Sequence, residues 1–146
     1  MKGIALMLKT APILLIENNP KDAKNILSIL ESLEENFRLF HLRTTREAQE
    51  YLRNNNDIQP WLILLGLRSE SPEGFEFLKK IKTDDNLRKI PVVIMASSNE
   101  QYHVLESFKL GVAGYIVKSQ DITELEGIIS TIMRYWNLCE LPPAGG

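Results

Sequence analysis

The feature that most constrains the fold is an alternation of short, uninterrupted apolar runs with helix-like patterns. An uninterrupted apolar run suits a parallel strand that is buried on both faces, and an amphipathic stretch suits a helix covering it. The five predicted strands are Ile13–Ile16, Phe37–Leu42, Trp61–Leu65, Ile90–Met95 and Tyr115–Lys118. This alternation predicts an α/β fold, a doubly wound five-stranded parallel sheet in the order 2-1-3-4-5 with helices on both faces.

Capping residues mark the expected ends of the helices. Helix starts are predicted at Asn19, which Pro20 follows, at Thr44, at Ser98 and at Asp121. Gly111 is expected to end the fourth helix, the one through Val104, Leu105 and Phe108, in a left-handed conformation.

Composition indicates one domain and excludes some partners. The 146 residues are 44% hydrophobic, which suits a domain at 11–138 between an N-terminal tail, 1–10, and a C-terminal tail, 139–146. Lys and Arg number 17 against 19 Asp and Glu, and no basic stripe is present, so nucleic acid is not expected as a partner. The apolar stretch Ile4–Leu8 is too short to cross a membrane. We therefore expect a cytoplasmic protein without a membrane partner.

In a doubly wound sheet the functional site lies beyond the carboxyl ends of the strands. The residues that leave the predicted strands there are Glu17 and Asn18, Gly66 and Arg68, Ala96 and Ser97, and Lys118. Gly66 opens a loop that leads to Gly74 and a third helix, Phe75–Lys82.

This set of residues, with its spacing, resembles the receiver domain of two-component response regulators, a CheY-like, flavodoxin-like fold. By that resemblance Gly66 replaces the phosphate-accepting Asp, and Ala96, with Ser97 beside it, replaces a hydroxyl residue. Glu17 keeps the first residue of an acidic pair, Asn18 replaces the second, and Lys118 is retained. Segments such as Gly111–Lys118 further resemble stand-alone response regulators associated with phytochromes.

The replacements predict a pocket without phosphate chemistry. Glycine offers no nucleophile for an acyl phosphate, and Glu17 alone should hold Mg²⁺ weakly at most, so no metal or cofactor is expected. We hypothesise that Lys118 forms a fixed ion pair with Glu17, and that Arg68 can fold over the vacated pocket. Tyr115 stands at the family's switch position, where an active-like or inactive-like state would be visible.

The resemblance therefore implies a non-enzymatic pseudo-receiver that acts in a phosphorelay pathway of bacteria through protein contacts. The expected partner is a signalling protein such as a histidine kinase or a photoreceptor. The expected contact surface is the face made by the fourth helix, the fifth strand and the last helix, which could also form a homodimer. Its residues of interest are Tyr102, His103, Glu106, Phe108 and Tyr115.

Three other functions are considered for this chain. A side chain such as Ser69 or Glu17 could accept phosphate instead of the missing Asp. A flavodoxin-like domain could bind a nucleotide or flavin, but the loop Glu17–Pro20 has no glycines that would let a phosphate approach the backbone. A hydrolase is disfavoured because no Gly-x-Ser-x-Gly motif is present, and His41 and His103 are expected in a strand and on the exposed side of a helix.

Overall fold

The computed structural model describes residues 11–33, 37–54, 59–68 and 71–140. A five-stranded parallel sheet in the order β2-β1-β3-β4-β5 forms its centre. The strands are β1 (Pro12–Ile16), β2 (Arg38–Leu42), β3 (Leu62–Leu67), β4 (Val92–Ala96) and β5 (Gly114–Val117). The helices are α2 (Pro20–Ser32), α3 (Thr45–Asn54), α4 (Glu73–Thr83), α5 (Gln101–Lys109) and α6 (Ile122–Leu138). The predicted fold class and strand order are confirmed.

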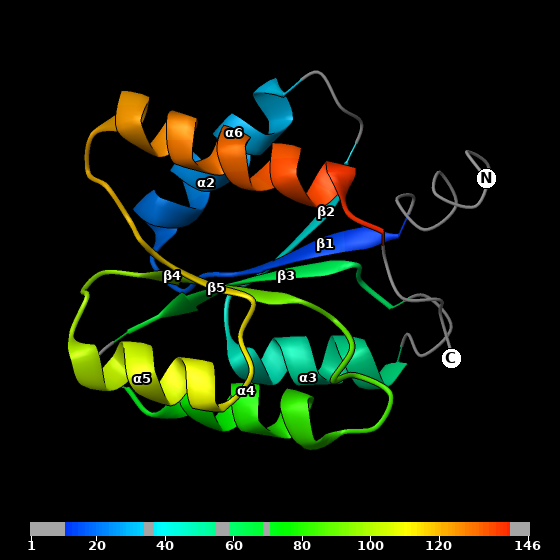
Figure 1. The fold of residues 1–146 in the computed structure, drawn as a ribbon. Coiled ribbons are helices and arrows are strands. Elements are labelled where there is room, and N and C mark those ends of the chain that lie inside the picture. The colour runs from blue at the N-terminus through cyan, green and yellow to red at the C-terminus, as the bar shows by residue number, and fades with distance from the viewer. Residues whose placement is uncertain (1–10, 34–36, 55–58, 69–70, 141–146) are drawn as a thin grey trace.

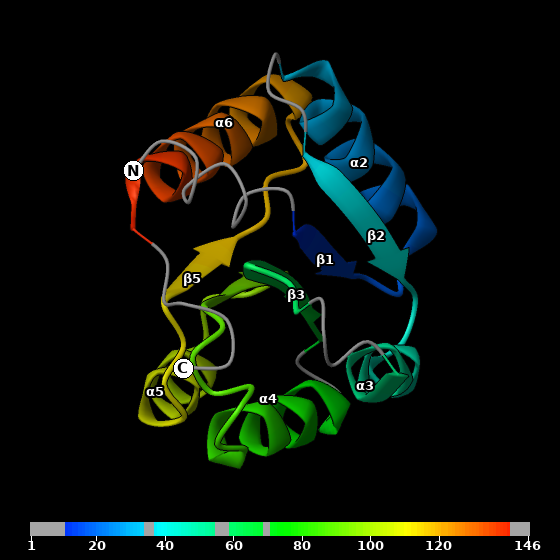
Figure 2. The ribbon, with the colours of Figure 1, turned by 90° about the vertical axis from the view of Figure 1, so that its right-hand side faces the viewer.

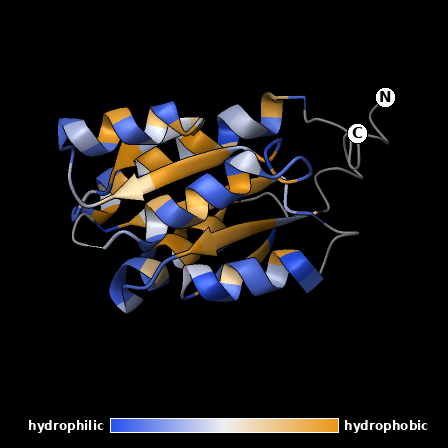
Figure 3. Cartoon of the chain, turned by 90° about the horizontal axis from the view of Figure 1, so that it is seen from below, coloured by the Kyte–Doolittle hydropathy of each residue, from blue (hydrophilic) through white to orange (hydrophobic). Residues whose placement is uncertain are grey.

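The helices cover both faces of the sheet. Helices α2 and α6 lie on one face, and α3, α4 and α5 lie on the other (Figures 1 and 2). Alternate residues of each strand enter two separate cores: Ile13 and Leu15 pack towards α2 and α6, whereas Leu14 and Ile16 pack on the opposite side. Figure 3 shows the hydrophobic strands between helices of mixed hydropathy. Full burial of each large aliphatic side chain stabilises the fold by about 1.5–3 kcal/mol.

Most of the predicted helix ends are confirmed. The Asn19 side chain accepts hydrogen bonds from the backbone N–H groups of Lys21 and Asp22, and the Thr44 hydroxyl accepts one from Glu47 N–H. Asp121 caps α6 through the N–H of Glu124. Gly111 has a φ of 93°, a conformation that glycine adopts without strain, so the turn after α5 depends on it.

Two predicted boundaries are wrong. Ser98 does not cap α5, whose N-cap is Glu100 without a side-chain hydrogen bond. Gly66 is not in the loop after the third strand but inside β3, opposite Met95 of β4. Strand β3 continues because Leu67 is buried and pairs with Ala96, so the buried apolar surface extends past the glycine.

Helix α5 has the reverse of the expected orientation. His103, predicted on the exposed side, is buried, and Ser107 is fully buried and donates its hydroxyl hydrogen bond to the carbonyl of His103. Leu105 and Phe108, which the prediction used as the apolar pattern of this helix, are 55% and 51% exposed. The packing of α5 on the sheet therefore overrides its hydrophobic pattern.

Every described helix and strand lies between residues 12 and 138, inside the predicted domain. The predicted tails, apart from Cys139 and Glu140, lie outside the described residues, as does Ser69.

Candidate functional site

Three strands bring charged and small residues together at the carboxyl edge of the sheet. Glu17 follows β1, Gly66 lies near the end of β3, and Lys118 follows β5. The Lys118 Nζ lies 2.9 Å from Glu17 Oε1, and the two side chains are only 8% and 2% exposed. The hypothesised ion pair between Lys118 and Glu17 is confirmed.

A third member of this cluster, Asp22, was missed by the sequence analysis. Its Oδ2 lies 2.8 Å from the same Lys118 Nζ, so one ammonium group bridges two carboxylates. The cap at Asn19 starts α2 and thereby places Asp22 in the first turn, next to the edge of the sheet. That cap was the available signal, because it fixes which side chains of α2 lie near the strand ends. We refer to Lys118, Glu17 and Asp22 as the ion-pair cluster.

The carboxylates outweigh the effect of burial on Lys118. Burial alone lowers the pKa of this amine, but the hydrogen bonds and charges of Asp22 and Glu17 act in the opposite direction and raise the pKa above its ordinary value of 10.5. Lys118 is therefore charged at neutral pH, and the cluster is a permanent feature of the folded protein at that pH.

The Glu17 side chain occupies the space that a side chain at position 66 would need. A Cβ atom added to Gly66 would lie 2.6 Å from Glu17 Oε1 and 2.9 Å from its Cδ, well inside contact distance. The carboxylate is held there from both sides, since Oε1 accepts from Lys118 and Oε2 accepts from the N–H of Asn19 at 3.0 Å. The ion-pair cluster therefore fits beside position 66 because glycine has no side chain there.

The other predicted pocket residues do not belong to the ion-pair cluster. Asn18 and Ser97 are exposed, and Ala96 is buried in β4 without a hydroxyl to offer. Arg68 is exposed and, together with Gly66, lines a cavity of about 70 Å³. Whether Arg68 places its charge over the pocket stays a prediction.

The residues at this edge do not fit a divalent cation. Mg²⁺ needs several oxygen ligands in octahedral geometry, but both oxygens of Glu17 already accept hydrogen bonds from nitrogen donors. Among the residues that the structure describes, no group of three or more His, Cys, Asp or Glu side chains could hold a metal ion.

The predicted contact residues divide into two groups. Tyr102 and Phe108 are 67% and 51% exposed, and Glu106 pairs with Lys109 at 3.6 Å on the surface. His103 faces inward: its ring stacks on Phe75 with centroids 5.6 Å apart. It therefore cannot offer the accessible contact that was predicted for it.

Tyr115 is tied to the loop that precedes α5. Its hydroxyl donates a hydrogen bond of 2.8 Å to the carbonyl of Ser98, and burial, followed by the charge of Glu100, raises the pKa of the phenol. The half-buried ring therefore connects β5 to the start of α5 in one defined conformation.

Most of the chain matches a known protein family. Residues 13–130 match the family model described as the response regulator receiver domain. The chain belongs to this family. Its membership places the protein in two-component signalling and agrees with the order of the strands in the sheet.

Individual relatives agree with this assignment. Response regulator Rcp1 from Synechocystis sp. is 30% identical over 128 residues, which cover 85% of this chain and 87% of the relative. The probable methanogenesis regulatory protein FilR2 of Methanothrix harundinacea is 32% identical over 127 residues, covering 85% and 82% of the two chains. The crystal structure of the phosphorylated cyanobacterial phytochrome response regulator RcpA has a TM-score of 0.83 at 33% identity, over 91% of this chain and 99% of the other.

Proposed function

We propose that this receiver domain is a pseudo-receiver, which transmits signals through protein contacts without accepting phosphate at the end of β3. The single observation that carries the proposal is the pairing of Gly66 with the buried Glu17 carboxylate, which lies where an acceptor side chain would begin. Glycine has no nucleophilic group, and the neighbouring carboxylate is already engaged by Lys118. The domain has no enzymatic activity in this proposal.

The proposal is tested by the intact mass of the protein after incubation with acetyl phosphate and Mg²⁺. The wild-type chain should gain no phosphoryl group, while RcpA, whose crystal structure contains the phosphorylated form, serves as the positive control. A stoichiometric phosphoryl adduct on the wild-type chain would overturn the proposal.

The same experiment decides whether another side chain accepts phosphate. Glu17 is a poor candidate because it is 3% exposed and its carboxylate is hydrogen-bonded on both oxygens. If an adduct forms, the variant Glu17→Gln shows whether that carboxylate carries it.

The proposed contact surface is the α5-β5-α6 face, the one predicted from the sequence. Its exposed apolar residues on α5 and β5 are Tyr102, Leu105, Phe108 and Val117. Exposed apolar side chains gathered on one face are a feature of protein interaction sites. We expect this face to bind a histidine kinase or a photoreceptor, in line with the phytochrome response regulators among the similar structures, or to form a homodimer.

The hydrogen bond between Tyr115 and Ser98 supports a single, unchanging conformation of the α5-β5-α6 face. With no phosphoryl group to sense, the loop before α5 is held by that hydrogen bond and the pocket by the ion-pair cluster. The domain would then act as a constitutive mimic or a competitor for the partner of a phosphorylated relative. A cytoplasmic location is part of the proposal; in the described part of the chain no helix is long and apolar enough to span a membrane.

A further inference from the structure

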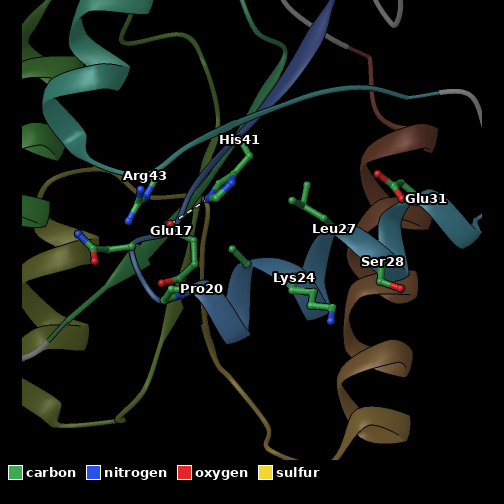
Figure 4. A pocket seen from close by; sticks show the side chains of 10 residues that line it. Glu17, Pro20, Lys24, Leu27, Ser28, Glu31, His41 and Arg43 are labelled. Carbon is green, nitrogen blue, oxygen red and sulfur yellow. Dashed lines mark hydrogen bonds between the residues drawn. The ribbon is translucent and has the colours of Figure 1, made fainter.

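Helix α6 is buried on one side only. Leu125, Ile129 and Met133 of this helix belong to the core that α6 and α2 share with the sheet. The ribbons of α2 and α6 run side by side, as Figure 4 shows at Ser28 and Glu31. The side of α6 that faces away from the core carries five exposed residues, which we call the outer seam: Glu124, Gly127, Thr131, Arg134 and Leu138.

The members of the outer seam have the spacing of a contact between two helices. Successive members are three or four residues apart in strict alternation, so they form one line along the helix. Leu138 in this line is 79% exposed, and Tyr135 beside it is 59% exposed. Apolar side chains with this exposure gain free energy when another molecule covers them.

Gly127 is not required by the packing of its own chain. A Cβ atom added there would meet nothing within 4 Å, and a glycine inside a helix is destabilising relative to alanine. The Thr131 hydroxyl donates a hydrogen bond of 2.8 Å to the Gly127 carbonyl, so this polar group is satisfied within the helix. The missing side chain leaves room for a second backbone to approach α6 closely.

The two charges of the outer seam are complementary to those of a second copy. Neither Glu124 nor Arg134 forms an ion pair with another described residue, and no opposite charge stands three or four positions from either of them. Both lie equally far in sequence from the midpoint between Gly127 and Thr131. Two antiparallel copies of α6 centred there would place Glu124 of each copy opposite Arg134 of the other. In a parallel pair, like charges would meet instead.

We propose that the outer seam binds the α6 helix of a second copy of this chain in antiparallel orientation. Gly127 and Thr131 lie where the helices cross, and Glu124 and Arg134 pair on both sides of the crossing. Because both copies use the same residues, the contact is two-fold symmetric and closes at a dimer. The inference rests on the homodimer in the proposed function and names α6 as the helix that forms it.

The test is sedimentation velocity of the full chain, at low ionic strength, over a series of concentrations. Glu124→Arg brings like charges together in both ion pairs and should raise the dissociation constant of the dimer about tenfold, and Arg134→Glu should do the same. An equimolar mixture of these two variants should associate as tightly as the wild type, because opposite charges meet again in both pairs. Glu126→Arg, at an exposed glutamate outside the seam, is the matched control and should leave the dissociation constant unchanged.

Gly127→Gln separates a lost contact from a damaged fold. Glutamine is a better helix former than glycine, and the position is exposed with open space around it, so the melting temperature of the variant should rise. Its dissociation constant should nevertheless rise at least tenfold, because the new side chain keeps the two helices apart.

Each contrary result has its own meaning. If the wild type dimerises and Glu124→Arg and Gly127→Gln dimerise with the same affinity, the α6 contact is wrong and the homodimer of the α5-β5-α6 face stands. A mixture of the two charge variants that associates no better than either variant alone would also overturn the proposal. A wild-type chain that stays monomeric up to its solubility limit would overturn both the contact and the homodimer, but not the binding of a kinase or photoreceptor.

Discussion

The sheet edge around Gly66 and the outer surface of α5 break the usual rule of burial in opposite ways. At the edge, the charged groups of Glu17 and Lys118 are withdrawn from water and bonded to each other. On α5, the polar His103 and Ser107 are buried while Leu105 and Phe108 are exposed. In the first region the charged groups pair with each other, whereas in the second region apolar side chains stay exposed to water.

This difference indicates where the domain keeps its capacity to interact. A buried ion pair of good geometry is costly to disturb, so the edge of the sheet should be rigid and unreactive. Exposed apolar side chains on a helix gain free energy only when another molecule covers them. The comparison therefore supports the proposal that the domain acts through its α5-β5-α6 face rather than through the pocket.

The largest expected effect comes from removing the cation of the cluster. Lys118→Met leaves the carboxylates of Glu17 and Asp22 close together without their common partner, and should lower the free energy of unfolding by about 3–5 kcal/mol. Lys109→Met breaks the exposed pair with Glu106 and is the matched control, with an expected loss of about 0–1 kcal/mol. Urea denaturation measures both, and equal losses would remove the distinction between the two regions.

The second effect concerns the space beside Gly66. Gly66→Ala should destabilise the fold by about 1–3 kcal/mol, because its Cβ would displace the Glu17 carboxylate from its hydrogen bonds. In a Glu17→Ala background the same change should lose most of that effect, and a double-mutant cycle measures the coupling. Full additivity of the two changes would show that Glu17 does not fill the space of the missing side chain.

The third effect is a dependence on alkaline pH. Because the pKa of Lys118 is raised in the folded state, its stabilising contribution is complete below 10.5 and falls as the pH rises from there through the folded pKa. Over that window the stability difference between the wild type and Lys118→Met should shrink by up to about 1.4 kcal/mol per pH unit. Thermal unfolding of both proteins at a series of pH values measures this difference, and a constant value would contradict the assignment of the cluster.

The smallest effect on stability is expected on α5. Phe108→Ser should change the free energy of unfolding by no more than about 0.5 kcal/mol, since the side chain is 51% exposed. It should nevertheless reduce self-association, which analytical ultracentrifugation at high protein concentration detects. If the wild-type chain dimerises and the variant dimerises with the same affinity, Phe108 is excluded from the interface.

The fold could be predicted because apolar strand runs and helix caps depend on residues that are close together in the sequence. The buried runs around Leu14 and Ile63 predicted the sheet, and Asn19 and Gly111 predicted helix ends that the structure contains. The pairing of Lys118 with Glu17 was also predicted, from the resemblance to receiver domains, in which the usual acceptor partner of this lysine is replaced here by Gly66.

Features that depend on tertiary packing were not predicted. The orientation of α5 is set by the surface on which it packs, so a hydrophobic pattern assigned His103 to the wrong side. Asp22 joins the cluster only because α2 starts at Asn19 and points its first turn towards Lys118.

We propose that the Glu17 carboxylate, paired with Lys118 beside Gly66, has replaced phosphate sensing. The most direct test is a ¹H–¹⁵N NMR titration of the wild-type chain with Mg²⁺ and beryllofluoride, a mimic of the acyl phosphate, with Gly66→Asp as the comparison. The signals of Gly66, Ala96 and Lys118 should stay in place in the wild-type protein. Shifts of these signals that spread to Tyr115 would contradict it, since they would show a pocket that still senses phosphate and transmits its presence to the α5-β5-α6 face.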